Sequence, residues 1–127
     1  MTLLDSLNPQ QKEAVTASDG PVLVLAGPGS GKTRVLTQRI AYLIGEKGIR
    51  GYQILAVTFT NKAAKEMKER VEDLIGPQFS QGLMLGTFHS VCVRILRREV
   101  ELLPYDSNFV IFDSKDQETV VKTALRE

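Results

Sequence analysis

Apolar residues occur along the chain in two alternating patterns. Short, continuous apolar runs occupy residues 22–26, 54–59, 83–87 and 109–112. Such runs are typical of strands that are covered on both faces in a parallel sheet. Between and after them, apolar residues recur at the spacing of a helix that buries one side, as in Val35, Leu36, Ile40, Leu43 and Ile44, or in Ala64, Met67, Val71, Leu74 and Ile75. The alternation predicts an α/β fold, a parallel sheet flanked by helices.

The last two helical patterns follow the third and fourth runs. We expect Val91, Ile95, Leu96, Val100 and Leu103 to face the core from one helix, and Val120, Val121, Ala124 and Leu125 from another. Ser114 and Gln117 have the spacing of a capping box at the start of the second of these helices.

An earlier helix start is marked by Asn8 as N-cap and Pro9 at the first helical position. Gln11 follows the cap by three residues, where its side chain can reach back to the Asn8 backbone in a capping box. A glutamine amide can also pair with the N6/N7 edge of adenine. The residues alone favour the cap and leave both roles open.

The turn between the first run and the following helix holds Gly27, Gly29 and Gly31, and then Lys32 and Thr33. Glycines allow the sharp turn that aims several backbone N–H groups at one phosphate. The helix that starts near Gly31 adds unpaired N–H groups and the positive end of its dipole. This order predicts a phosphate-binding loop in which Lys32 contacts the β- and γ-phosphates and the Thr33 hydroxyl binds Mg²⁺.

The loop departs from the common spacing at its first position, because Ala26 stands where a glycine is usual. Alanine is the next smallest residue, so the loop is retained provided Ala26 needs no positive φ. The alternative is a glycine-rich turn without a ligand. Arg34 lies in the first turn of the helix, within reach of a bound nucleotide, although an arginine there is by default a solvated or paired charge.

Composition excludes several classes of protein. The 127 residues are enough for one domain, and 43% hydrophobic and 24% charged residues are typical of a soluble globular chain. No apolar run is long enough to span a bilayer. The single cysteine excludes an internal disulfide and is compatible with the cytoplasm, while the single histidine excludes a site built on several histidines. A net charge of +1 does not discriminate for or against nucleic acid.

Polar and aromatic residues follow the second and third runs, where open α/β sheets bind ligands. Phe59, with Asn61 beside it, suits a stacking surface for single-stranded bases, or is a ring buried beneath the next helix. Thr87 and His89 lie where a phosphate could be held, and His89 is otherwise a structural residue at a helix start. Thr60 or Asn61 is expected to cap the helix between them.

Nucleotide hydrolysis usually requires a further strand that ends in acidic residues. The nearest candidate is Asp113, which follows the fourth run and is better interpreted as a turn or cap residue. The chain therefore has a binding loop and lacks part of a catalytic apparatus, which indicates a fragment.

Four segments together resemble superfamily 1 DNA helicases of the UvrD/Rep/PcrA type, over nearly the whole chain. They are similar to the Q motif, motif I, motif Ia and motif Ib of that family, in the family's order: 7–15, 26–34 (Ala26, Gly27, Pro28, Gly29, Ser30, Gly31, Lys32, Thr33 and Arg34), 58–67 and 86–97. Motif I of the family commonly begins with alanine, which accounts for Ala26.

The resemblance implies roles for individual residues. Gln11 and Arg34 would contact the nucleotide, together with the loop from Ala26 to Thr33. Phe59 would place its ring against a base of single-stranded DNA, with Asn61 also contacting DNA, and Thr87 and His89 would lie on the phosphate side.

The resemblance also implies the architecture of the parent protein. Two RecA-like domains would hold ATP between them and step along DNA in the 3′-to-5′ direction, in DNA repair or replication. Residues 1–90 would form the first part of RecA-like domain 1A, and residues 91–127 a helical continuation toward the inserted 1B subdomain. The acidic motif II, other strands of the sheet and the second domain would be absent, so the piece alone is expected to be inactive.

Two other functions stay open from the residues: a different P-loop enzyme such as a small kinase, and a non-catalytic nucleotide- or single-strand-binding module. A kinase would need a site for a phosphoryl acceptor, which the turns after 59 and 87 do not resemble. Exposed sheet edges also predict self-association of the isolated piece.

Overall fold

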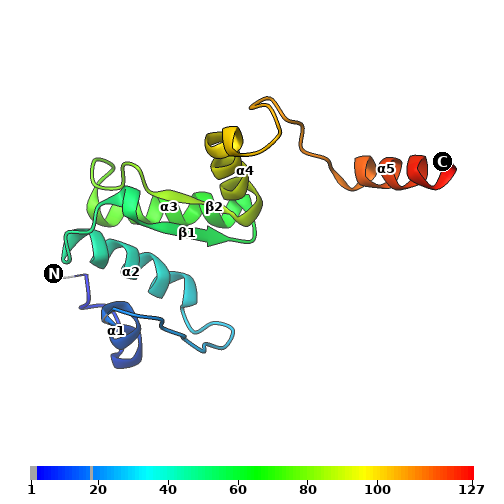
Figure 1. The fold of residues 1–127 in the computed structure, drawn as a ribbon. Coiled ribbons are helices and arrows are strands. Elements are labelled where there is room, and N and C mark those ends of the chain that lie inside the picture. The colour runs from blue at the N-terminus through cyan, green and yellow to red at the C-terminus, as the bar shows by residue number, and fades with distance from the viewer. Residues whose placement is uncertain (1–2, 18) are drawn as a thin grey trace. The chain divides into compact units, whose positions relative to one another are not determined.

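The computed structural model describes residues 3–17 and 19–127 and divides the chain into two compact units, one that extends to Val91 and one that begins at Cys92. Elements of the first unit are α1 (Pro9–Thr16), α2 (Lys32–Gly45), the 3₁₀ turn η1 (Gly51–Gln53), β1 (Leu55–Thr58), α3 (Asn61–Ile75) and β2 (Met84–Thr87) (Figure 1). Helix α4 (Phe88–Glu99) starts in this unit and continues into the second, which also holds η2 (Val100–Leu102) and α5 (Ser114–Arg126). Among the described residues, no helix has the length and apolarity needed to cross a membrane.

The strands β1 and β2 pair in parallel, as the apolar runs predict. Ala56 is the register partner of Leu85, so both side chains lie on the same face of the sheet, and both are buried. They share one core cluster with Ile40 of α2 and with Met67 and Val71 of α3. Helices α2 and α3 pack against each other in this core, so the mixed α/β architecture is confirmed.

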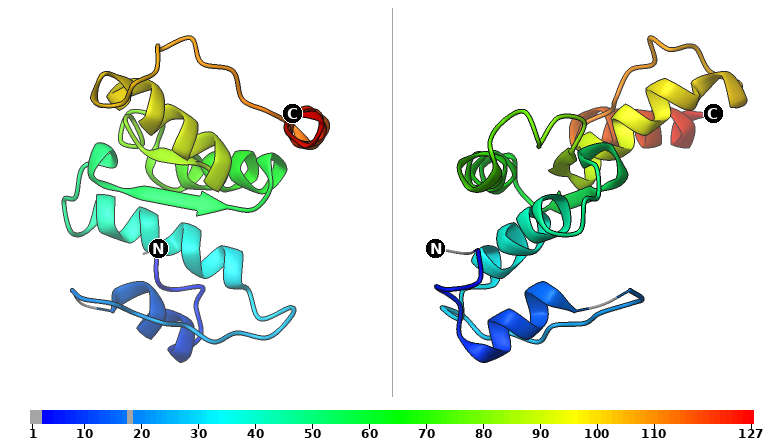
Figure 2. Two further views of the ribbon diagram at one scale, coloured as in Figure 1. Left: turned by 45° about the vertical axis from the view of Figure 1, so that its right-hand side comes forward. Right: turned by 90° about the vertical axis from the view of Figure 1, so that its left-hand side faces the viewer.

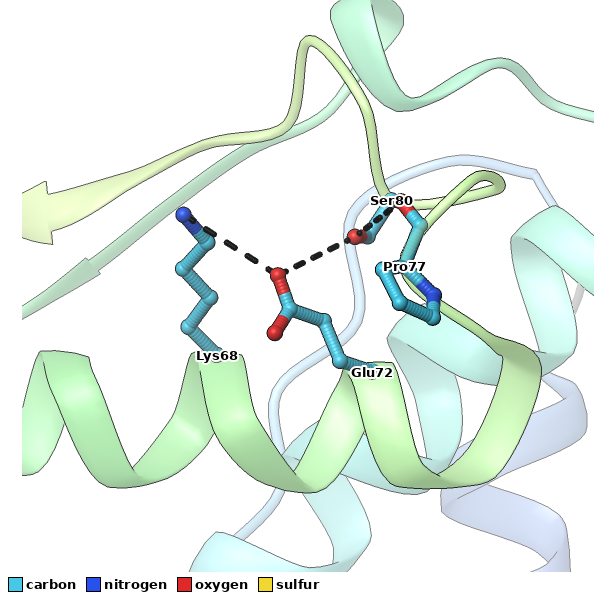
Figure 3. A network of polar contacts seen from close by, with 4 residues as sticks. All are labelled: Lys68, Glu72, Pro77 and Ser80. Atoms are coloured by element: carbon cyan, nitrogen blue, oxygen red, sulfur yellow. Dashed lines mark hydrogen bonds and ion pairs between the residues drawn. The ribbon is translucent and has the colours of Figure 1, made fainter.

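The turn after α3 is stabilised by a small network of polar contacts (Figure 3). The buried hydroxyl of Ser80 donates to the Pro77 carbonyl over 3.0 Å and lies 3.4 Å from Glu72 Oε1. The same Glu72 oxygen is 4.0 Å from the Lys68 ammonium, one helical turn earlier. The contacts tie the end of α3 to the loop that leads into β2.

The first apolar run does not form a strand, which is the main difference from the sequence prediction. Residues 21–27 are extended but pair with no strand among the described residues, and Leu23 and Leu25 are 84% and 88% exposed. Figures 1 and 2 show α2 lying between this extended segment and the β1–β2 sheet. A strand that is apolar on both faces is stable when neighbouring strands pair with its backbone and other elements cover both of its faces. Among the described residues, no strand pairs with this segment, and the face that carries Leu23 and Leu25 is uncovered.

The second unit departs from the prediction for the same reason. Residues 109–112 form no strand, and α5 has no buried residue, so Val120, Val121, Ala124 and Leu125 face solvent rather than a core. In α4 and its continuation, Val91 and Val100 are buried, whereas Ile95, Leu96 and Leu103 are partly exposed. The cap of α5 is Asp113, whose carboxylate accepts from the Asp116 N–H, so its interpretation as a turn or cap residue is confirmed. The capping box predicted at Ser114 and Gln117 is wrong, because Ser114 is the first residue of the helix.

Candidate functional site

The glycine-rich loop makes a tight turn directly before α2. Ser30 donates its backbone N–H to the Gly27 carbonyl over 3.3 Å. Gly29 and Gly31 have φ angles of +73° and +81°, a region that other residues rarely adopt, while Gly27 has negative φ. Gly31 is the N-cap of α2, so Lys32 is its first residue and Thr33 its second. The first N–H groups of a 14-residue helix thus point toward the loop.

Helix α1 is held against this loop through Gln11. The predicted capping box is confirmed, because the Gln11 N–H donates to Asn8 Oδ1 over 2.8 Å and Gln11 Oε1 accepts from the Asn8 N–H over 3.0 Å. In addition, Gln11 Nε2 donates to the Ser30 carbonyl over 3.2 Å. A glutamine amide has two donor hydrogens and two acceptor lone pairs. One of each is used here, so capping and contact with a base are compatible.

Two arginines of α2 also reach α1 and the residues before it. Arg34 Nη2 donates to the Ser6 carbonyl over 3.1 Å, so in this structure its side chain is directed at the chain itself. A guanidinium has five N–H groups, which leaves donors for a ligand. Arg39 Nη1 lies 3.0, 3.1 and 3.2 Å from the carbonyl oxygens of Ala14, Val15 and Ala17.

A cavity of about 580 Å³ opens between α1, the extended segment with its loop, and α2. The polar residues that line it are Asn8, Gln10, Gln11, Ser30, Lys32 and Arg39, and apolar side chains such as Val22, Val24, Val35 and Leu36 form much of the remaining wall. Ligand sites commonly have such a volume and combine apolar walls with placed polar groups. The cavity therefore combines the residue predicted to contact adenine with the lysine predicted to contact phosphates.

A second group of predicted residues lies at the carboxyl ends of the two strands. Thr58 and Thr87 are register partners, so the residues that follow them, Phe59 and Phe88, lie next to each other. The ring centroids are 5.6 Å apart and the rings are tilted by 41°. Phe59 is 91% exposed, which excludes the alternative of a ring buried beneath α3.

The remaining predicted residues lie beside this ring pair. Asn61 is the first residue of α3, whose cap is Thr60. Thr87 precedes α4, and its hydroxyl oxygen accepts from the Ser90 N–H over 3.1 Å, while Ser90 Oγ accepts from the Thr87 N–H over 3.0 Å. His89 is exposed in the first turn of α4. Two helix N-termini therefore flank an exposed aromatic pair.

A smaller cavity of about 300 Å³ joins the two groups of residues. Lys32, Thr33 and Leu36 line it from α2, and Phe59 lines it from the end of β1. Lys32 and Leu36 also line the larger cavity. The start of α2 thus lies between the predicted nucleotide residues and the predicted DNA residues.

Sequence reasoning missed two residues that the structure places in these groups. Phe88 had a detectable signal, because it follows the third apolar run as Phe59 follows the second. Arg39 had none, since only the tertiary arrangement brings it to the carbonyl end of α1.

Among the described residues, no group of three or more His, Cys, Asp and Glu side chains could hold a metal ion. Thr33 is exposed and provides one neutral hydroxyl at the start of α2. Mg²⁺ in nucleotide sites is held largely by phosphate oxygens and water, with one or two protein ligands. The donors therefore suit a magnesium ion that arrives with a triphosphate, and they form no metal site on their own.

The chain matches one protein family and several curated relatives. Residues 7–127 match the UvrD/REP helicase N-terminal domain. The ATP-dependent DNA helicase PcrA of Bacillus subtilis is 57% identical over 125 residues, which is 98% of this chain and 17% of that protein. The proteins of the same name from Staphylococcus aureus and Staphylococcus epidermidis are 54% and 55% identical over 124 residues, again 98% of this chain and 17% of theirs. The chain thus spans about a sixth of the length of these relatives.

Proposed function

Because the chain belongs to the family of UvrD/REP helicase N-terminal domains, we propose that it is the N-terminal ATP-binding part of a DNA helicase. The parent protein would use ATP to step along single-stranded DNA in the 3′-to-5′ direction. The observation that carries this proposal is the cavity of about 580 Å³ that Gln11 and Lys32 line together.

Each part of ATP has a matching group in that cavity or at the loop and helix start beside it. The backbone N–H groups from Gly29 to Lys32 surround the phosphates, and the Lys32 ammonium offsets the charge on the β- and γ-phosphates. The Thr33 hydroxyl is a ligand of the accompanying Mg²⁺. Gln11 offers its second donor and second acceptor to the N6/N7 edge of adenine. Arg34 turns from the Ser6 carbonyl toward the nucleotide.

The ATP site is tested by titrating the chain with a non-hydrolysable ATP analogue and Mg²⁺ while backbone amide resonances are recorded. We expect the largest shifts at Gly29, Ser30 and Gly31, and a shift of the Gln11 side-chain amide. Resonances of α5 serve as the internal control and stay in place. Unchanged loop resonances at saturating analogue would contradict the proposal.

Single-stranded DNA is the proposed partner at the strand ends. Phe59 and Phe88 form an apolar surface that a base can cover by stacking. The N-termini of α3 and α4 beside it carry partial positive charge that favours phosphates. His89 and Lys62 are exposed there as well.

Replacing Phe59 by alanine is expected to weaken binding of single-stranded DNA by about 1–3 kcal/mol, because one stacking surface is lost. The ring is 91% exposed, so the free energy of unfolding should stay within about 0.5 kcal/mol of the wild-type value. The measurement is fluorescence anisotropy of a labelled oligonucleotide at one fixed salt concentration.

Phe79→Ala is the matched control, since Phe79 is also exposed and lies in the loop before β2, at the opposite end of the sheet from Phe59. Equal losses for Phe59→Ala and Phe79→Ala would indicate a general hydrophobic contribution and would contradict a stacking site at Phe59.

The parent helicase would act in the cytoplasm, in DNA repair or replication. The 127 residues should not unwind DNA on their own, because no described strand ends in the acidic pair that hydrolysis requires. A strand-separation assay with this chain and ATP checks this expectation, and rapid unwinding would contradict it.

Self-association of the isolated chain is a further expectation. The extended segment exposes Leu23 and Leu25, and the described sheet has only two strands, so it leaves an edge of each without a strand partner. Such edges pair readily with other chains. Light scattering should therefore give a mass that rises with concentration, and a constant monomer mass at high concentration would contradict the expectation.

A further inference from the structure

Helix α1 needs an external support if Gln11 is to read adenine, a role that rests on the proposed function. The helix has only eight residues, and Val15 is its one buried residue. A helix of that length is not stable by itself in water. Contact of an amide with a base edge requires the donor and acceptor to lie within a few tenths of an ångström of their hydrogen-bonding positions. The orientation of α1 must therefore be set by its neighbours.

The carbonyl end of α1 is held by Arg39. Its Nη1 group lies 3.0 Å from the Ala14 oxygen, 3.1 Å from the Val15 oxygen and 3.2 Å from the Ala17 oxygen. The last carbonyl groups of a helix have no partner within the helix and carry partial negative charge. A partly buried guanidinium satisfies them and offsets that charge.

The other end of α1 is held by the loop. Gln11 Nε2 donates to the Ser30 carbonyl, and the Asn8 cap fixes the Gln11 backbone and side chain. Both Gln11 and Arg39 line the larger cavity. Arg39 lies seven residues after Lys32 on the same helix, so α2 carries the phosphate contact near its start and the support of α1 two turns later.

We propose that Arg39 is a positioning residue for adenine recognition: it fixes the carbonyl end of α1 and thereby orients the Gln11 amide toward the base. Without Arg39, the carbonyl end of α1 loses its hydrogen bonds to α2 and is held there only by the packing of Val15, so the helix can tilt about its Gln11 end. The phosphate contacts are unaffected, because the loop and Lys32 belong to α2 and the segment before it. Arg39 thus contributes to selection of the base and not to binding of the phosphates.

The test compares three ligands in the complete protein that contains this chain. ATP carries the 6-amino group, purine riboside triphosphate lacks it, and inorganic tripolyphosphate has no base. We expect the wild-type protein to prefer ATP over purine riboside triphosphate by about tenfold, within the range for a bidentate contact to a base. Arg39→Ala should reduce this ratio to about twofold or less and leave the affinity for tripolyphosphate unchanged.

Three further variants separate positioning from stability. Arg39→Lys keeps a cationic donor and should restore most of the ratio, whereas Arg39→Gln gives an intermediate ratio and serves if the alanine variant fails to fold. Arg70→Ala removes an exposed arginine of α3 and should leave the ratio and all three affinities unchanged. A purely structural defect lowers the fraction of protein that can bind, so it reduces the apparent affinity for all three ligands by the same factor.

Each outcome decides the inference. An unchanged ATP preference in Arg39→Ala, or an equal loss for all three ligands, overturns it. Gln11→Ala in the same assay separates its failure from that of the proposed function. If Gln11→Ala abolishes the preference and Arg39→Ala does not, only the positioning role is wrong. If the wild-type protein does not prefer ATP over purine riboside triphosphate, or if Gln11→Ala retains that preference, Gln11 does not recognise adenine. The positioning role of Arg39 is then wrong as well.

Discussion

Lys32→Ala is expected to lower the affinity of the chain for ATP at least tenfold and hydrolysis by the complete helicase by about 10²–10³-fold. The ammonium is the one side-chain charge that the loop itself presents to the phosphates, and its effect is greatest where charge develops in the transition state. Lys32 is exposed and lies at the helix start, so its loss removes no buried packing. Calorimetric titration measures the affinity, and phosphate release by the complete protein measures hydrolysis.

The control for this prediction is Lys122→Ala in α5. Lys122 is also an exposed helical lysine, and it lies 2.7 Å from Glu118 in an ion pair of the kind that contributes little in water. Its removal should leave both ATP binding and hydrolysis unchanged. Normal hydrolysis in Lys32→Ala would mean that the loop does not hold the reacting phosphates.

Gly31→Ala should destabilise the chain by about 2–3 kcal/mol and impair nucleotide binding as well. The φ angle of +81° costs a residue with a Cβ about 1–2 kcal/mol. The new Cβ would lie 2.9 Å from Gln11 Nε2, so the amide must shift, and its hydrogen bond to the Ser30 carbonyl is weakened at a cost of up to about 1 kcal/mol. Chemical denaturation measures the first effect, and the ATP titration measures the second.

The other two glycines of the loop are the matched controls. Gly27 has negative φ, and no atom lies within 4 Å of the place that an alanine Cβ would take, so Gly27→Ala should leave stability nearly unchanged. Gly29 has a φ of +73° and equally open surroundings, so Gly29→Ala should show the backbone strain alone. The expected order of destabilisation is Gly31, then Gly29, then Gly27. Equal effects at all three would contradict the geometry of the loop.

Local features such as helix caps and helix starts were predicted well from the sequence. The Asn8 cap with Gln11 and the helix start near Gly31 are confirmed, and of the two candidate caps of α3 the structure has Thr60. Each depends on hydrogen bonds between residues about three positions apart, so neighbours in the sequence are enough to determine it. The capping box of α5 was predicted one residue late, although Asp113 was itself expected to be a turn or cap residue, because Asp113 and Asp116 have the same spacing as Ser114 and Gln117.

Predictions that needed a distant partner were right only where the partner is among the described residues. The runs at 54–59 and 83–87 pair with each other and form the sheet. The runs at 22–26 and 109–112 have the same composition but no strand beside them, and they remain irregular. An apolar run indicates only that its side chains tend to be buried. A strand also needs a second strand, whose backbone forms hydrogen bonds with its N–H and C=O groups.

The sequence by itself determined the tight glycine-rich turn before α2, the cap of α1, the start of α3 at Thr60 or Asn61, and the family to which the chain belongs. Only the tertiary structure decided that Phe59 is paired with Phe88, that Gln11 contacts Ser30, and that Arg39 holds the end of α1. The physical reason is the distance along the sequence between the residues that interact. Caps and turns depend on dihedral angles and hydrogen bonds within a few residues, whereas burial and contacts between elements depend on which surfaces meet after the chain has folded.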